Sequence, residues 1–261
     1  MSFLDAHNHL HDARLAPDRG PILAELSRIG LQRAVVNGTR EDDWPAVREL
    51  ATQHSWIVPS YGLHPWYAPQ CSNDWLETLR EYLTGDPRAG IGEIGLDRWI
   101  EGHALAVQTP VFTAQLALAV ELDRAATIHC VRAWGALEEV IRTHPLPRRG
   151  FLLHAYSGPT EMIGTFVERG AYFSFSPYFL HERKAAQREA FRHVPRERLL
   201  VETDAPDLRP PDSHNPRLLA DASGEPVNHP ANIDVAYRAL AEIRGEPIES
   251  PVAENFARLF L

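Results

Sequence analysis

The chain has 261 residues, of which 44% are hydrophobic and 23% charged, a balance typical of a globular protein. Its net charge of −9 argues against a surface that wraps nucleic acid, although a local pocket can still bind a phosphate-bearing substrate. No apolar run is long enough to cross a bilayer, the N-terminal residues lack the features of a signal peptide, and two distant cysteines suggest no disulfide framework, so we expect a cytoplasmic protein without a membrane partner.

Short apolar or β-branched runs alternate along the chain with amphipathic stretches. The eight runs expected to be strands cover residues 3–6, 33–37, 57–61, 90–94, 126–130, 151–154, 171–175 and 199–202. The helical segments between them cover residues 17–29, 43–54, 73–83, 108–122, 134–143, 159–169 and 181–193. A proline-rich loop over residues 205–230 then precedes two last helices, over residues 231–244 and 250–260. This order predicts an α/β protein with a TIM-type (β/α)8 barrel in one domain, residues 1–261.

Side chains able to bind a metal stand where five of the predicted strands end. In chain order they are His7, His9, Glu93, His129, His154 and Asp204. The active-site groups of such a barrel gather at the C-terminal ends of its strands, so we expect these six side chains to converge.

The pair His7 and His9 forms the sharpest single motif. Residues i and i+2 of a strand point to the same face, so both imidazoles can reach one ion at about 2.0–2.1 Å. Glu93 lies in the glycine-flanked apolar run 90–95, where a charge needs compensation. It either pairs with an arginine or bridges two metal ions roughly 3.5–4 Å apart, and we favour the bridge.

Two further apolar strands end in histidine. His129 or His154 alone is most simply explained as a hydrogen-bonded core residue, but two such strands next to each other in barrel order favour a metal site. Asp204 at the end of the eighth strand can hold the metal and accept a proton from water.

These motifs resemble those of the TatD family of metal-dependent deoxyribonucleases, within the amidohydrolase-like barrels. The matching segments are residues 5–10 (DAHNHL), 62–65 (GLHP), 92–97 (GEIGLD), 128–129 (IH), 154–158 (HAYSG), 202–206 (ETDAP) and 255–260 (NFARLF). The resemblance therefore covers essentially the whole chain, and seven motifs in the same order are highly specific.

The resemblance implies two divalent metal ions and cleavage of phosphodiesters, commonly as an exonuclease on DNA. One ion would bind to His7, His9, Glu93 and Asp204, and the second to Glu93, His129 and His154. His64 would lie beside the metals and orient a phosphate.

The chain departs from the family pattern at positions on the substrate side. The sequence reads Arg98-Trp99-Ile100 where the family has two aromatics and then arginine, and Arg132 comes three residues after His129 rather than two. The N-E-P of the long loop is replaced by residues 228–230, NHP.

We predict that His64, Arg98, Arg132 and Asn228 bind substrate. Arg209 is a further candidate to clamp a phosphate, with a solvated surface charge as the alternative. The aromatic side chains Trp66, Trp99 and Tyr156 could stack on a base, although such residues more often pack in the core or at the rim.

The expected reaction is hydrolysis by a metal-activated water, with Asp204 as general base and Glu93 and His64 as further catalytic residues. Imidazole and carboxylate ligands suit zinc, manganese, iron or nickel, and magnesium less well. The expected partner is DNA or another phosphodiester, and no obligate protein partner is evident. An amidohydrolase or deacylase acting on a carbonyl, in a small molecule or an aminoacyl-tRNA, is the alternative; a non-catalytic metal-binding protein is a weaker one.

Overall fold

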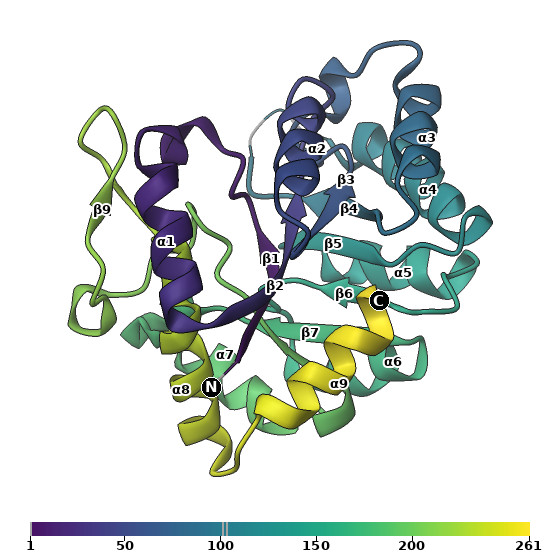
Figure 1. The fold of residues 1–261 in the computed structure, drawn as a ribbon. Helices are drawn as coiled ribbons and strands as arrows, with labels where there is room; N and C mark the ends of the chain where they lie inside the picture. Colours follow the sequence, from purple (N-terminus) through teal and green to yellow (C-terminus); the bar gives the residue numbers. More distant parts are fainter. Residues whose placement is uncertain (1, 101, 103) are drawn as a thin grey trace.

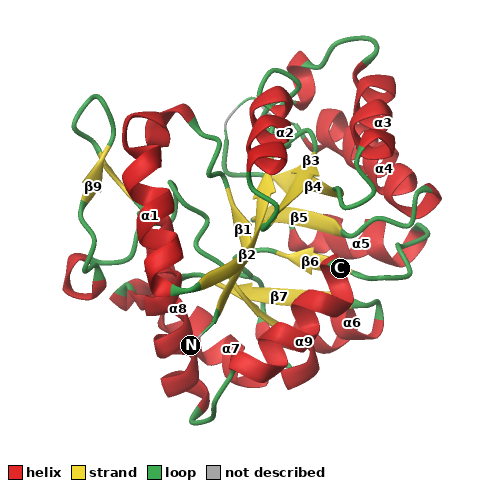
Figure 2. Ribbon diagram, viewed as in Figure 1, coloured by secondary structure: helices red, strands yellow, loops and turns green. Residues whose placement is uncertain are grey.

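The structure, a computed structural model, describes residues 2–100, 102 and 104–261. Eight parallel strands form one sheet whose spatial order follows the chain (Figures 1 and 2). The strands are β1 (Phe3–Asn8), β2 (Leu31–Asn37), β3 (Ile57–Tyr61), β4 (Gly90–Asp97), β5 (Ala126–Val131), β6 (Phe151–Leu153), β7 (Ala171–Phe175) and β8 (Leu199–Val201).

The first and last strands lie next to each other, so the barrel is nearly closed. The Asp204 amide donates a hydrogen bond to the His7 carbonyl at 2.9 Å, and the His9 amide donates to the Ala205 carbonyl at 2.8 Å. These bonds join the carboxyl end of β1 to the segment that follows β8, where two groups of predicted ligands lie. The predicted TIM-type barrel is confirmed.

Helices surround the strands, as Figure 2 shows. They are α1 (Arg19–Ile29), α2 (Trp44–Gln53), α3 (Trp75–Gly85), α4 (Leu105–Glu121), α5 (Trp134–Thr143), α6 (Ile163–Glu168), α7 (Ala185–His193), α8 (Ile233–Arg244) and α9 (Glu249–Phe260). The predicted helices 159–169 and 181–193 begin instead with 3-10 turns, over Thr160–Met162 and Glu182–Lys184. In the part of the chain that the structure describes, no helix combines the length and the apolar character needed to cross a membrane.

The long loop after β8 contains a short hairpin that we predicted as irregular chain. Its strands, β9 (Leu219–Ala220) and β10 (Pro226–Val227), pair antiparallel beside α1 (Figure 1). Two-residue strands are too short for a hydrophobic period to reveal them. Arg217, two residues before β9, connects the hairpin to the helices of the barrel. Its guanidinium donates hydrogen bonds to Glu25 in α1 and to Asp234 in α8.

Most residues of the barrel strands are buried, and the exposed ones, Gln32 and Arg33, lie near the start of β2. All eight residues of β4 and all five of β7 are buried. The helices contribute large side chains from outside; Trp44 of α2 is fully buried and its indole N–H donates to the Gly62 carbonyl at 3.1 Å. Close packing of this kind leaves few voids and keeps the strand ends in fixed positions relative to one another.

Candidate metal centre

Four side-chain atoms from β1, β4 and the end of β8 form a first donor cluster. His7 Nε2 lies 3.2 Å from Asp204 Oδ1 and 3.4 Å from Glu93 Oε2. His9 Nε2 lies 3.3 Å from each of these oxygens and 3.3 Å from His7 Nε2. Four ligands placed tetrahedrally about 2.0–2.1 Å from one ion would be about 3.3–3.4 Å apart, so this set fits a divalent metal.

The other oxygen of Glu93 faces a second cluster. Glu93 Oε1 lies 2.9 Å from His129 Nδ1 and 2.8 Å from His154 Nε2, and these two nitrogens are 3.2 Å apart. A carboxylate that directs one oxygen to each of two imidazole pairs has the form expected of a bridging ligand. The structure thus brings together all six predicted ligands, from five strand ends.

Glycines around Glu93 allow β4 to pass close to its neighbours. A Cβ on Gly92 would lie 2.7 Å from Thr127 Cβ, and one on Gly95 would lie 2.0 Å from the His129 carbonyl oxygen. Gly95 also has a φ of +144°, which side-chain-bearing residues rarely adopt. The glycine-rich run that contains Glu93 is therefore required by the approach of β4 to β5.

The second ring nitrogens of the predicted ligand histidines differ in their partners: that of His9 is hydrogen-bonded, whereas Nδ1 of His7 and of His154 has no hydrogen-bond partner within the described residues. His9 Nδ1 lies 2.7 Å from the Asn37 carbonyl oxygen, which makes Nδ1 the protonated nitrogen and leaves Nε2 free to bind an ion. His154 Nδ1 is 3.6 Å from Glu202 Oε1, and the other oxygen of Glu202 accepts a hydrogen bond from the Ser174 hydroxyl. Such partners fix the ring orientation of metal-binding histidines.

Asp97 at the end of β4 orients a third histidine. Asp97 Oδ2 lies 2.9 Å from His129 Nε2 and accepts the indole N–H of Trp66 at 2.8 Å. Residue-by-residue reasoning missed both Asp97 and Glu202 as site residues. The available signal was their place inside the motifs GEIGLD and ETDAP.

The Asp97→Asn variant is expected to lose about 10–100-fold in metal affinity or activity, because an amide cannot accept hydrogen bonds on both atoms and His129 loses its anionic partner. Calorimetric metal titration measures the effect. Asp123→Asn, before the opposite end of β5, is the matched control. Equal affinities for all three proteins would show that Asp97 does not position His129.

Burial makes the charges of this centre strongly interdependent. Burial alone would raise the pKa of the Glu93 carboxyl, but the surrounding imidazoles, His154 foremost, hold it well below its ordinary value. The pKa of Asp204 is likewise held low against burial, by hydrogen bonds from His7 and His9. Two ionised carboxylates in a buried site need positive charge nearby, and divalent cations supply it.

His64 is a neutral imidazole whose tautomer is fixed by the backbone. Its Nδ1 accepts the Trp66 backbone N–H at 3.2 Å, so the proton is on Nε2, which lies 3.6 Å from Glu93 Oε1. Burial and the charge of His129 lower the pKa of His64 to about 3. His64 is therefore a neutral hydrogen-bond donor aimed into the centre, and it also lies close enough to Glu93 and His129 to belong to a ligand group.

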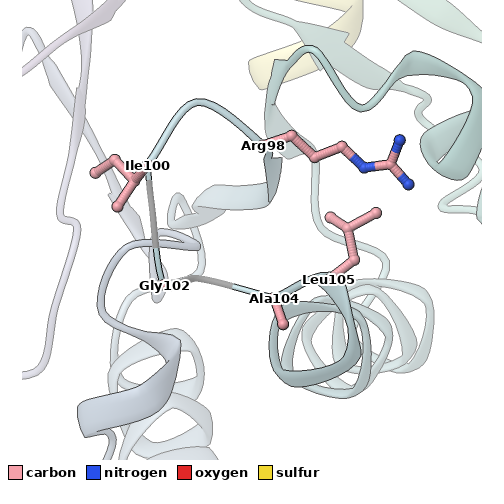
Figure 3. Close-up of a pocket in the computed structure, with 5 residues that line it drawn as sticks. All are labelled: Arg98, Ile100, Gly102, Ala104 and Leu105. Carbon is pink, nitrogen blue, oxygen red and sulfur yellow. The ribbon is translucent and has the colours of Figure 1, made fainter.

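The two predicted arginines lie at the surface beside the centre. Arg98 lines a pocket of about 480 Å³ that contains none of the six ligands (Figure 3). In this pocket Arg98 and Ile100 point away from each other. The Arg132 guanidinium lies over the Trp99 ring, 4.1 Å from its centroid.

Two of the substrate-side interpretations are not supported by burial. Asn228 is completely buried, and its amide N–H₂ donates to the Thr203 carbonyl at 2.8 Å, which supports the backbone just before Asp204. Tyr156 is also fully buried, with its hydroxyl bonded to the Pro159 carbonyl, so it is core and cannot stack on a base. Neither side chain is exposed to a substrate in this structure.

The sequence model of the family described as TatD related DNase matches residues 4–261. The chain belongs to the TatD-related DNase family. It is 28% identical to the uncharacterized metal-dependent hydrolase YjjV of Escherichia coli K12, over 95% of this chain and 92% of the relative. It is 29% identical to the 3'-5' ssDNA/RNA exonuclease TatD of Pantoea ananatis, over 97% and 96% of the two chains.

A solved structure agrees with these similarities. The crystal structure of the YjjV TatD homologue from Escherichia coli K12 superposes with a TM-score of 0.89 at 27% identity, covering 99% of this chain and 97% of the other. The predicted family, barrel and enzyme class, a metal-dependent hydrolase, are confirmed.

Proposed function

We propose that this TatD-family hydrolase cleaves phosphodiester bonds of single-stranded nucleic acid, using two divalent ions. His7, His9, Glu93 and Asp204 would hold one ion, and Glu93, His129 and His154 the other. The observation that carries the proposal is the placement of the two Glu93 oxygens, each facing a separate donor cluster. The relative named as a 3'-5' ssDNA/RNA exonuclease supports this substrate class.

When bound, the ions would supply positive charge for the phosphoryl oxygens and lower the pKa of water toward neutrality. Asp204 is the general base, because its carboxylate is ionised, buried and at the mouth of the barrel. The Nε2–H of neutral His64 donates a hydrogen bond to a phosphate oxygen. Arg132, and Arg98 beside it, add positive charge at the rim, where a guanidinium can contact phosphate in bidentate fashion.

Imidazole and carboxylate ligands favour zinc, manganese, iron or nickel as the metal, and magnesium is less suited. The same groups can also act on a carbonyl carbon. Activity on esters and aminoacyl esters therefore distinguishes this alternative from phosphodiester cleavage.

Metal-loaded protein is expected to release mononucleotides from single-stranded DNA and p-nitrophenol from a p-nitrophenyl phosphodiester. EDTA should abolish both activities and lower the melting temperature, since a ligand at 100 times its Kd stabilises the native state by about 2.7 kcal/mol. Rates with and without each added metal, together with melting curves, provide the measurement. Hydrolysis of carboxyl esters alone would replace the phosphodiester proposal by the carbonyl one, and activity that survives EDTA would contradict the role of the metal.

A further inference from the structure

Two exposed tryptophans lie beside the metal centre. Among the residues that the structure describes, the exposed large hydrophobic side chains include only two aromatic ones, Trp66 and Trp99, with 38% and 60% of their surface exposed. Other large aromatic side chains are buried in the core, as Phe173 and Tyr172 are, or are half-buried, as Trp56 and Trp75 are. Exposed indoles at a site opening are the kind of surface that planar ligands cover.

The same carboxylate anchors both tryptophans. Asp97 Oδ1 accepts the Trp99 backbone N–H at 2.5 Å, while Oδ2 accepts the Trp66 indole N–H at 2.8 Å and lies 2.9 Å from His129 Nε2. The Trp66 ring also meets His64 edge to face, with centroids 4.9 Å apart. Both aromatic residues are thus connected to the side of the centre that contains His129, not to the side formed by His7 and His9.

Arg132 extends this aromatic surface. Its guanidinium lies over the Trp99 ring at 4.1 Å, and its backbone adopts a φ of +53°, a region that costs a non-glycine residue free energy. The stack leaves the planar cation next to an exposed indole, and both groups can stack on a base. On a chain with a net charge of −9, such a local cation would offset repulsion of a phosphate backbone.

We propose that Trp66, Trp99 and Arg132 form a stacking subsite for nucleobases of a single-stranded substrate, next to the phosphodiester to be cleaved. This inference rests on the proposed phosphodiesterase function. Aromatic stacking is tolerant of sequence because every base has a π-face, so the subsite would favour bases in general over a bare sugar-phosphate chain. Duplex DNA, whose bases are stacked on one another, would gain nothing from it.

The test compares two fluorescent oligomers of equal length, thymidine and abasic, both phosphorothioate-linked so that metal-loaded protein binds them without rapid cleavage. Fluorescence anisotropy gives the Kd for wild type and for Trp66→Ala, Trp99→Ala and Arg132→Ala. Wild type should prefer the thymidine oligomer. Each alanine variant should raise the Kd for the thymidine oligomer about 10-fold, since a stacked base contributes about 1–3 kcal/mol. Trp66→Ala and Trp99→Ala should change the Kd for the abasic oligomer about 2-fold or less.

Controls separate stacking from damage to the centre. Trp99→Phe keeps an aromatic face and should retain the preference for the thymidine oligomer. Arg132→Lys keeps the charge but not the planar guanidinium, so it should lose part of this preference. Arg142→Ala, an exposed residue on α5 paired with Glu139, should match wild type. Bound metal, measured for each variant, must equal that of wild type.

An unchanged thymidine preference in Trp66→Ala and Trp99→Ala would overturn the subsite. So would a wild-type protein that cleaves p-nitrophenyl phosphodiesters yet binds both oligomers equally, a result that leaves the proposed function intact. Hydrolysis of carboxyl esters alone would instead refute the proposed function itself.

Discussion

Replacing Asp204 by asparagine is expected to reduce turnover by about 10²–10⁴-fold, the usual contribution of a positioned general base. Asparagine keeps the size of the side chain but cannot accept a proton from water. The residue has a φ of +55°, which asparagine tolerates about as well as aspartate, so the fold should persist. Steady-state kinetics on a p-nitrophenyl phosphodiester and the circular dichroism melting curve give the two readouts.

The matched control for this variant is Asp207→Asn. Asp207 lies three residues further along the same loop and makes an exposed ion pair with Arg14, so its loss should change turnover little. Because Asp204 is also a proposed ligand, bound metal must be measured in parallel. Wild-type turnover in Asp204→Asn would show that Asp204 is not the base. If the variant binds metal more weakly but reaches wild-type turnover at saturating metal, Asp204 is a ligand only.

The largest effect is expected for Glu93→Gln. Glu93 is the one side chain shared by both donor clusters, so the wild type should bind two ions per chain and the variant fewer than one. An amide presents a single oxygen and no charge, and it therefore cannot bridge two cations. Activity should fall below detection, and mass spectrometry of bound metal after dialysis measures the stoichiometry.

Metal-free Glu93→Gln should also be less stable than the metal-free wild type. The carboxylate lies among buried imidazoles, and removing one partner of a buried charge pair costs roughly 3–5 kcal/mol. Urea unfolding in EDTA measures this difference. Glu77→Gln, on an exposed face of α3, is the control and should unfold like wild type. If Glu93→Gln retained two ions per chain, the bridging role would be wrong.

The sequence by itself predicted the barrel and the convergence of six side chains that could bind a metal. Apolar runs alternating with amphipathic segments specify βα units, and the rule that parallel strands end on one side brings their last residues together. His7 and His9, two residues apart on a strand, had to share a face. The strand boundaries were less well defined, since β2 begins at Leu31 and β4 continues to Asp97, two and three residues beyond the predicted limits.

Only the tertiary structure decided what surrounds those six side chains. Nothing local to the sequence distinguishes buried Asn228 and Tyr156 from exposed Trp99 and Arg132, because burial of a loop residue depends on which distant segment covers it. The role of Asp97 is also tertiary, since its two oxygens join the backbone of Trp99, the indole of Trp66 and the ring of His129. The apolar pattern of the sequence predicts where the strands end. The orientation of each side chain depends on hydrogen bonds between loops, which form only when the folded barrel brings those loops together.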